Sequence, residues 1–221
     1  DVIFDLGANI GYYPMLENAI LKGKCNIFSV EPDPRNIKVL QANISEFNLK
    51  NIQFEQLAIS NFTGEAELVF SDKTNLNKLS LIGDNANSDE VTVNVPVVDF
   101  AEYIRKIGHI DVLRMDIEGA EVNIFDSLVN NYEKDRSLKI PRKIIFETRY
   151  YDQNKEKMKS YLSKMIEIGY KLEFLGSDDE HHKQPVVGSL GYKPFKVFHE
   201  AHCSRGVYAD ISDDHIVELI S

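Results

Sequence analysis

Short apolar runs alternate with helical patterns over the first third of the chain. Val2 to Leu6, Asn26 to Val30 and Ile52 to Ala58 predict buried strands. Between them, Tyr12 to Lys22 and Ile37 to Phe47 repeat apolar residues every three or four positions, as amphipathic helices do. Such alternation is typical of βαβ units around a parallel, doubly wound sheet, so the pattern predicts an α/β fold.

The periodicity changes to about two from Gly64 onward. Apolar residues then alternate with polar ones in two stretches, at Ala66, Leu68 and Phe70 and again at Val91, Val93 and Val95. Period-two alternation favours strands, and we expect these two to pair as an antiparallel β insertion after the third strand. The polar segment between them, Ser71 to Glu90, predicts a mobile loop near the mouth of a site.

The later part of the chain returns to alternating strands and helices. We expect strands at Ile110 to Met115, Lys143 to Glu147, Tyr170 to Leu175 and Gly206 to Ile211, with helices at Asp99 to Ile107, Glu121 to Val129 and Lys155 to Ile168. No repeat or linker marks a second domain, so residues 1–221 are expected to form one domain with a variable tail over residues 176–205. Asp1 already lies inside a strand, so we expect further residues upstream of it.

Composition narrows the class of protein. With 43% hydrophobic and 27% charged residues, the chain is typical of a soluble globular protein. Its net charge of −10, without a run of Lys or Arg, disfavours nucleic acid and anionic membranes as partners and favours a small-molecule or glycan acceptor. Cys25 and Cys203 are interpreted as buried free thiols. No signal peptide or membrane-spanning run is found, so a cytoplasmic location is expected.

The first strand ends in a pattern that predicts a cofactor loop. Asp5 is followed by Gly7 and Gly11 at the turn into a helix, and glycine lets a backbone pass close to a ligand. Asp5 can accept a hydrogen bond from an ammonium group, and Glu31, twenty residues after Gly11 (31 minus 11), can accept from both ribose hydroxyls. The two glycines lack the spacing of a dinucleotide loop, which disfavours NAD. The pattern therefore predicts a different nucleoside cofactor.

Four motifs in order resemble those of the FkbM methyltransferase family. They are Asp5 to Tyr12, Val30 to Pro34, Leu57 to Ser60 followed by Gly64, and Ile110 to Glu121. The resemblance runs from Asp1 to about Leu175 and implies a seven-stranded class I methyltransferase sheet, S-adenosyl-L-methionine as cofactor, and O-methylation. The cofactor contacts that we expect are Asp5, Gly7, Ala8, Asn9, Gly11, Tyr12, Glu31, Pro32, Ala58 near the adenine, and Asp116. An acidic residue beside the adenine is not evident around Gln56 to Ser60.

Three carboxylates are candidates for catalysis. Asp116 and Glu118 directly follow the fourth core strand and Glu147 ends the fifth, where an open α/β sheet directs side chains into the ligand crevice. One of them could be the general base for an alcohol, or several could hold acceptor hydroxyls or a divalent cation. Alternatively, Asp116 anchors the turn at Gly119, and Glu118 and Glu121 favour the positive end of the following helix.

Other functions are less well supported by the sequence. Nitrogen-directed methyltransferases often carry Asn or Asp followed by Pro-Pro and an aromatic residue after the fourth strand, where this chain reads Asp116-Ile117-Glu118-Gly119. A non-catalytic protein that keeps the S-adenosylmethionine-binding fold stays open as an alternative. The spacing of His199, His202 and Cys203 is weak evidence for zinc, so no metal is expected.

Overall fold

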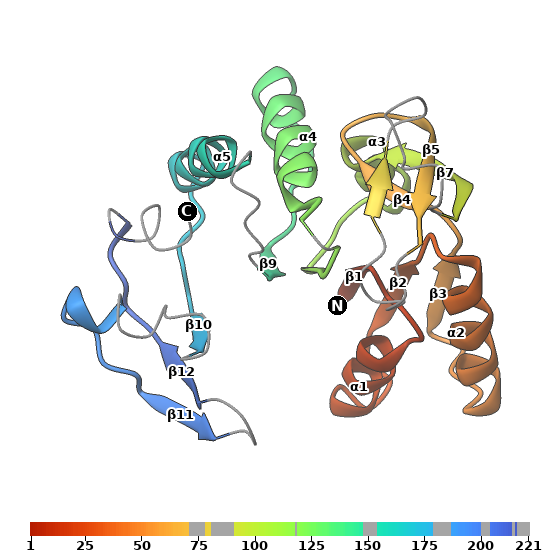
Figure 1. Ribbon diagram of the computed structural model, residues 1–221, viewed down its shortest axis with the longest axis horizontal. Helices are drawn as coiled ribbons and strands as arrows, with labels where there is room; N and C mark the ends of the chain where they lie inside the picture. The colour runs from red at the N-terminus through yellow and green to blue at the C-terminus, as the bar shows by residue number, and fades with distance from the viewer. Residues whose placement is uncertain are drawn as a thin grey trace. The chain divides into compact units, whose positions relative to one another are not determined.

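In the computed structural model, five parallel strands form a central sheet in the order β3-β2-β1-β8-β9 (Figure 1). The strands are β1 (Val2–Leu6), β2 (Asn26–Val30), β3 (Ile52–Glu55), β8 (Val112–Met115) and β9 (Lys143–Phe146). The structure describes residues 1–70, 78–80, 91–117, 119–147, 154–178, 187–199, 204–213 and 215. The chain runs outward from β1 to β3 on one side and from β8 to β9 on the other. The boundary between β1 and β8 is therefore a topological switch point, where open α/β sheets bind ligands. The predicted α/β fold is confirmed.

Helices cover both faces of this sheet (Figure 1). They are α1 (Tyr12–Ile20) and α2 (Pro34–Glu46) on one face, and α3 (Phe100–Ile107) and α4 (Glu121–Lys134) on the other. Successive strand residues point to opposite faces: Ile3 packs in the core cluster that contains Leu40 of α2, whereas Phe4 stacks on Tyr103 of α3 with ring centroids 4.9 Å apart. Burial of these apolar side chains holds the layers together.

Local sequence sets where two of these helices begin. Asp33 precedes α2 and its carboxylate accepts a hydrogen bond from the backbone N–H of Arg35 at 2.7 Å, while Pro34 occupies the first helical position. Asp99 precedes α3 and accepts from the N–H groups of Ala101 and Glu102. Both helices thus start at an aspartate that satisfies otherwise unpaired backbone donors.

A second sheet contains the strands that the period-two pattern predicted. Its order is β4-β7-β5-β6, with β4 (Ala58–Ser60), β5 (Gly64–Val69), β6 (Lys78–Ser80) and β7 (Thr92–Asp99). The predicted antiparallel pairing is confirmed between β5 and β7. The predicted third strand, Ile52 to Ala58, is confirmed over Ile52–Glu55, but its predicted end is wrong, because the chain leaves the central sheet after Glu55 and β4 pairs with β7. Outside residues 78–80, the predicted mobile loop at residues 71–90 lies outside the described residues.

The contacts of the chain form two compact units, residues Asp1–Arg149 and Tyr150–Ser221, where the sequence indicated one domain. The second unit contains α5 (Lys155–Glu167) and an antiparallel sheet in the order β10-β12-β11. Its strands are β10 (Leu175–Asp178), β11 (Lys196–His199) and β12 (Ser204–Tyr208). The described part of the variable tail, residues 176–178, 187–199 and 204–205, therefore includes paired β-strands.

Two strand predictions change in this second unit. The predicted strand Tyr170 to Leu175 is wrong, since Tyr170 to Phe174 are not in a strand and β10 starts only at Leu175. The side chains of Lys171 and Glu173 in this stretch are exposed. The predicted last strand, Gly206 to Ile211, overlaps β12 but begins too late. Within the described ranges, the central sheet therefore has five strands rather than the seven that the resemblance implied.

Two further expectations concern single features. Cys25 is a buried free thiol, as predicted, and Cys203 lies outside the described residues. Of the helices that the structure describes, none combines the length and apolar character needed to cross a bilayer.

Candidate functional site

The loop after β1 turns tightly through left-handed backbone conformations. Gly7, Asn9 and Gly11 have φ values of 80°, 50° and 92°. The N–H groups of Gly7 and Ala8 both donate to the carbonyl of Val30, each at 3.1 Å. The loop is therefore fixed to the end of β2 before α1 begins.

The glycines are required by neighbours within the chain. A Cβ on Gly7 would lie 2.2 Å from the carbonyl oxygen of Asp116, and one on Gly11 would lie 2.8 Å from Cδ1 of Leu40. Both glycines were predicted from the sequence to let the backbone pass close to a ligand, and this stays a prediction. The structure adds two reasons of its own, positive φ and close packing against β8 and α2.

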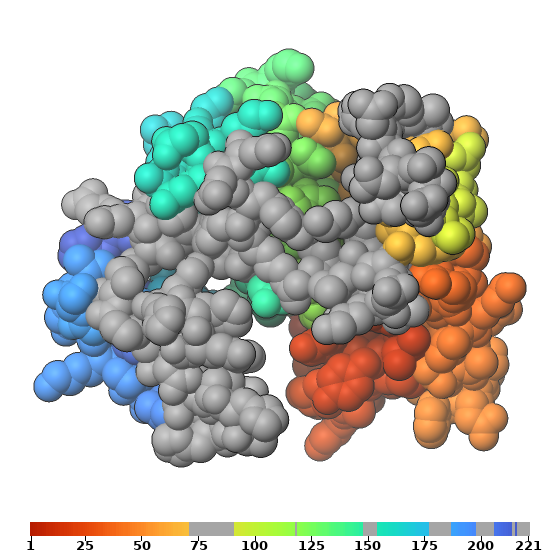
Figure 2. Space-filling view, in the orientation of Figure 1, coloured from red at the N-terminus to blue at the C-terminus, as the bar shows by residue number. Residues whose placement is uncertain are grey.

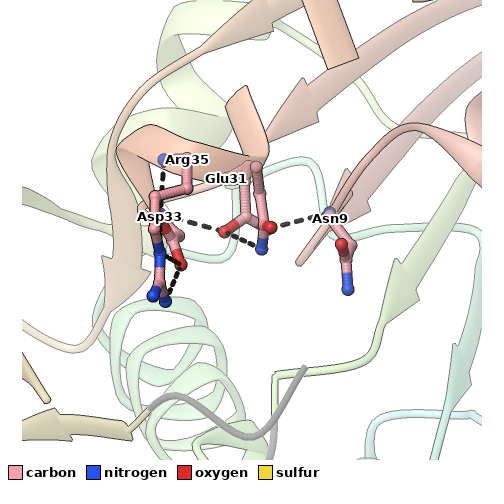
Figure 3. A network of polar contacts seen from close by, with 5 residues as sticks. Asn9, Glu31, Asp33 and Arg35 are labelled. Carbon is pink, nitrogen blue, oxygen red and sulfur yellow. Dashed lines mark hydrogen bonds and ion pairs between the residues drawn. The ribbon is translucent and has the colours of Figure 1, made fainter. Parts of the chain in front are cut away.

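Glu31 at the end of β2 ties this loop to the start of α2 (Figure 3). One carboxylate oxygen accepts from the N–H of Asn9 at 2.8 Å, and the other accepts from the N–H of Asp33 at 2.9 Å and from Asn36 Nδ2 at 3.4 Å. Burial raises the pKa of Glu31, and these hydrogen bonds oppose that rise. A carboxylate has about four acceptor positions, so capacity is left for a ribose hydroxyl.

The turn between Glu31 and α2 carries its own ion pair. The Arg35 guanidinium donates to both oxygens of the Asp33 carboxylate, with Nη2 2.7 Å from Oδ2, and lies 3.9 Å from the ring centroid of Phe70 (Asp33 and Arg35, Figure 3). This ion pair fixes the Asp33 and Arg35 side chains close to Pro32, a predicted cofactor contact that is partly buried.

A second polar group lies at the switch point, between the sheet and α1. Asp5 of β1 and Arg114 of β8 are register partners, and Arg114 Nη1 donates to Asp5 Oδ1 at 2.7 Å. Arg114 Nη2 donates to Asp116 Oδ2 at 3.2 Å, and the Tyr13 ring lies 3.5 Å from the guanidinium carbon. Asp5 is fully buried; burial raises its pKa and Arg114 opposes the rise. Arg114 was not among the residues predicted from the sequence, although a charged residue inside an apolar strand requires a partner.

The candidate catalytic carboxylates occupy the same edge of the sheet. Asp116 directly follows β8, its N–H donates to the carbonyl of Leu6 at 3.1 Å, and its side chain is 34% exposed. Glu147 directly follows β9 and is exposed. Because β1, β8 and β9 are parallel, Asp116 and Glu147 lie at the same edge of the sheet, and Asp116 lies against Gly7. Glu118 lies outside the described residues.

Glu121 supports the turn after β8. It is buried, accepts a hydrogen bond from the N–H of Ile117 at 3.2 Å, and has a pKa that burial raises. The anchoring role that the sequence analysis considered for Asp116 is thus performed at least in part by Glu121. No three His, Cys, Asp or Glu side chains gather as a metal site within the ranges that the structure describes.

The remaining predicted contacts lie in different surroundings. Tyr12, in α1, is 62% exposed and meets the Tyr13 ring edge to face. Helix α1 is drawn in red in Figure 2. Ala8 is buried in the core, and the Ala58 side chain packs against Ala66 and Val97, so Ala58 offers a ligand only its backbone. These contacts stay predictions.

The acid at the end of the third strand is Glu55, one residue before the stretch in which the sequence analysis sought it. Its carboxylate accepts from Tyr103 Oη at 2.6 Å and from Lys106 Nζ at 2.8 Å. These bonds lower the pKa of Glu55, although partial burial opposes them. Glu55 is therefore engaged with α3.

Glu17 of α1 adds an acidic side chain that the sequence analysis did not consider. Its Oε2 is buried and accepts no hydrogen bond from the described residues. Burial and the neighbouring Asp5 raise the pKa of Glu17 to about 7, and Arg114 opposes the rise. The folded state therefore binds the Glu17 proton more tightly than the unfolded chain does.

We expect Glu17→Gln to stabilise the protein more at pH 8 than at pH 5. The stability linked to the Glu17 proton is complete below the ordinary pKa of 4.5 and is lost as the pH rises to about 7. Glutamine carries no charge, so the variant should be more stable at pH 8 by about 1 kcal/mol, after allowance for the partial exposure of this side chain. Thermal unfolding of both proteins at the two pH values measures this, and equal differences at pH 5 and pH 8 would contradict it.

Comparison with known families identifies the chain. The model of the methyltransferase FkbM domain matches residues 5–172. The chain belongs to the FkbM methyltransferase family. Its cofactor is accordingly S-adenosyl-L-methionine. No curated relative matches the sequence.

Solved structures resemble this FkbM chain only distantly. The FkbM methyltransferase from Methylobacillus flagellatus KT has a TM-score of 0.46 at 18% identity, with 74% of this chain and 37% of that one covered. Precorrin-6y C5,15-methyltransferase from Geobacter metallireducens GS-15 has a TM-score of 0.42 at 12% identity, covering 96% and 80%. Fibrillarin from Aeropyrum pernix, solved with S-adenosyl-L-methionine, has a TM-score of 0.43 at 13% identity, with 95% of this chain and 66% of that one covered. The chain thus spans 37% of the length of the Methylobacillus protein, and the assignment rests on the family model.

Proposed function

We propose that this chain is an S-adenosyl-L-methionine-dependent O-methyltransferase that acts on a hydroxyl of a sugar or another small molecule. The observation that carries the proposal is the attachment of the Gly7–Gly11 loop to Glu31, beside the switch point between β1 and β8. Family membership supports methyl transfer. The net charge of −10 supports a neutral acceptor rather than a nucleic acid.

The residues at this edge fit the cofactor. Glu31 keeps acceptor capacity for ribose hydroxyls, next to the backbone of Asn9. Asp5 and Asp116 both contact the Arg114 guanidinium, and two carboxylates against one guanidinium favour a cationic ligand. When bound, the cofactor supplies an electrophilic methyl group on a cationic sulfur.

The chain's own contribution to methyl transfer is to orient the acceptor and to take up its proton. A hydroxyl that accepts a methyl group must lose its proton, and a carboxylate at the strand ends would accept it. Asp116 and Glu147 are the described candidates for that carboxylate. Their exposure at the strand ends leaves them accessible to an acceptor.

Two alternatives make different predictions. A non-catalytic protein with this fold would bind the cofactor without turnover, and an N-methyltransferase would use amines. The residues after β8, Asp116-Ile117, lack the prolines of many nitrogen-directed enzymes, which favours the oxygen-directed reaction. The seven-stranded sheet and the cytoplasmic location stay predictions.

Calorimetric titration with S-adenosylhomocysteine tests the cofactor site. We expect the wild type to bind it and not NAD. Gly11→Val should lose binding, because the new side chain meets Leu40 and a β-branched residue is strained at a φ of 92°. Gly176→Val is the matched control, since Gly176 has open space around it.

The outcomes separate the functions. A wild-type protein that binds neither ligand, or prefers NAD, would refute the proposal. If it binds S-adenosylhomocysteine, release of that product from S-adenosyl-L-methionine with a panel of sugars and small alcohols distinguishes an enzyme from a binding protein. The same assay with amines tests the nitrogen-directed alternative.

A further inference from the structure

A row of polar side chains crosses the middle of the central sheet on the face toward α1. Ser29, Asp5 and Arg114 are register partners on β2, β1 and β8, so their side chains share one face. Two residues earlier on the same face, Ile3 and Ile27 belong to the apolar core. Charged groups at such a depth are costly unless paired. Their position at the switch point therefore calls for a specific role.

Arg114 connects the two strands that meet at the switch point. Its two terminal nitrogens separately contact Asp5 Oδ1 at 2.7 Å and Asp116 Oδ2 at 3.2 Å. The Tyr13 ring covers the guanidinium face at 3.5 Å, so packing as well as charge fixes the plane of the group. The Arg114 side chain is only 10% exposed. Both acids are held by one rigid side chain.

The two acids differ in access to a ligand. Asp5 is fully buried, whereas the Asp116 side chain is 34% exposed at the end of β8. The backbone of Asp116 is also held, because its N–H donates to Leu6 and its carbonyl oxygen lies against Gly7. A ligand at the strand ends thus meets Asp116, and Asp5 lies behind it as the counter-ion of Arg114.

We propose that Arg114 is a positioning residue, which holds the Asp116 carboxylate at the switch point to accept a hydrogen bond from the α-ammonium group of the cofactor. This inference rests on the proposed function, and it moves the ammonium contact from Asp5, where the sequence placed it, to Asp116. Arginine suits the role because its planar fork reaches Asp5 and Asp116 at once, which a lysine ammonium does less well. The assignment leaves Glu147 as the described candidate to accept the proton of the acceptor.

The test compares two ligands that differ in whether they carry the amino-acid part, with its ammonium and carboxylate groups. S-adenosylhomocysteine carries the ammonium group, and 5′-methylthioadenosine shares its adenosine and thioether but lacks the amino-acid part. We expect Asp116→Asn and Arg114→Lys each to weaken the affinity for S-adenosylhomocysteine by about tenfold or more. The affinity for 5′-methylthioadenosine should change by less than about twofold. Removal of the Asp116 charge would strengthen contact with the ligand's carboxylate, so a loss of affinity reports on the ammonium.

Controls separate positioning from a general structural role. Arg105→Lys, on the half-exposed Arg105 of α3, should leave both affinities unchanged. Arg114→Met should lose more S-adenosylhomocysteine affinity than Arg114→Lys, and thermal unfolding shows whether it folds. Equal loss of both ligands, or no loss in Asp116→Asn, would overturn the inference. Failure of the wild type to bind either ligand would instead refute the proposed function.

Discussion

Gly7→Ala is expected to abolish binding of S-adenosylhomocysteine and to destabilise the protein by about 3 kcal/mol or more. A Cβ at this position would lie 2.2 Å from the backbone oxygen of Asp116, and no side-chain rotation can relieve that contact. The left-handed backbone at a φ of 80° adds about 1–2 kcal/mol of strain for any L-residue with a Cβ. The Gly7 loop must then move away from Asp116 at the end of β8, which disrupts the contacts between the ends of β1 and β8 at the switch point.

Gly108→Ala isolates the backbone contribution. Gly108 has a comparable φ of 95°, but nothing lies within 4 Å of the position of its Cβ. This variant should therefore cost only about 1–2 kcal/mol and leave ligand binding unchanged. Chemical unfolding of both variants gives the change in the free energy of unfolding, and calorimetry gives the change in ligand affinity. If Gly7→Ala were no worse than Gly108→Ala, close packing against Asp116 would not be the reason for glycine.

The sequence predicted the parallel sheet because its strands have strong local signals. Each is a short apolar run between helices whose period is 3.6, and burial on both faces gives no competing pattern. The end of β3 was harder to predict. The apolar character continues through Leu57 to Ile59, but Ala58 pairs with Val97 in another sheet, and no local pattern records a partner so distant in sequence.

Only those residues of the candidate site that belong to a sequence motif were predicted. Glu31 was identified from its position at a strand end, and the structure adds that it binds the N–H groups of Asn9 and Asp33. Arg114 and Glu17 were missed, since each matters through register and packing rather than through spacing. One signal was available: an arginine in the apolar strand Val112–Met115 requires a buried acid, and a parallel register with β1 supplies Asp5.

Glu31→Gln should be nearly as damaging as removal of the whole side chain. All three groups that contact the carboxylate are donors: the N–H groups of Asn9 and Asp33 and the amide Nδ2 of Asn36. Glutamine has one acceptor oxygen, so its NH2 group must face a donor and leave a buried N–H unpaired. We expect a loss of about 1–3 kcal/mol in stability and about tenfold to a hundredfold in S-adenosylhomocysteine affinity.

Glu46→Gln is the matched control, because Glu46 is an exposed residue at the end of α2, the helix that begins just after Glu31. It makes the same chemical change and should alter neither stability nor binding. Calorimetry with 5′-methylthioadenosine adds a second distinction, because this ligand keeps the ribose. Glu31→Gln should therefore weaken the affinity for 5′-methylthioadenosine as much as that for S-adenosylhomocysteine, whereas Asp116→Asn should not. Wild-type affinity for both ligands in Glu31→Gln would show that Glu31 neither fixes the loop nor binds the ribose. Equal losses in Glu31→Gln together with a selective loss in Asp116→Asn would assign the ribose to the end of β2 and the ammonium to the end of β8.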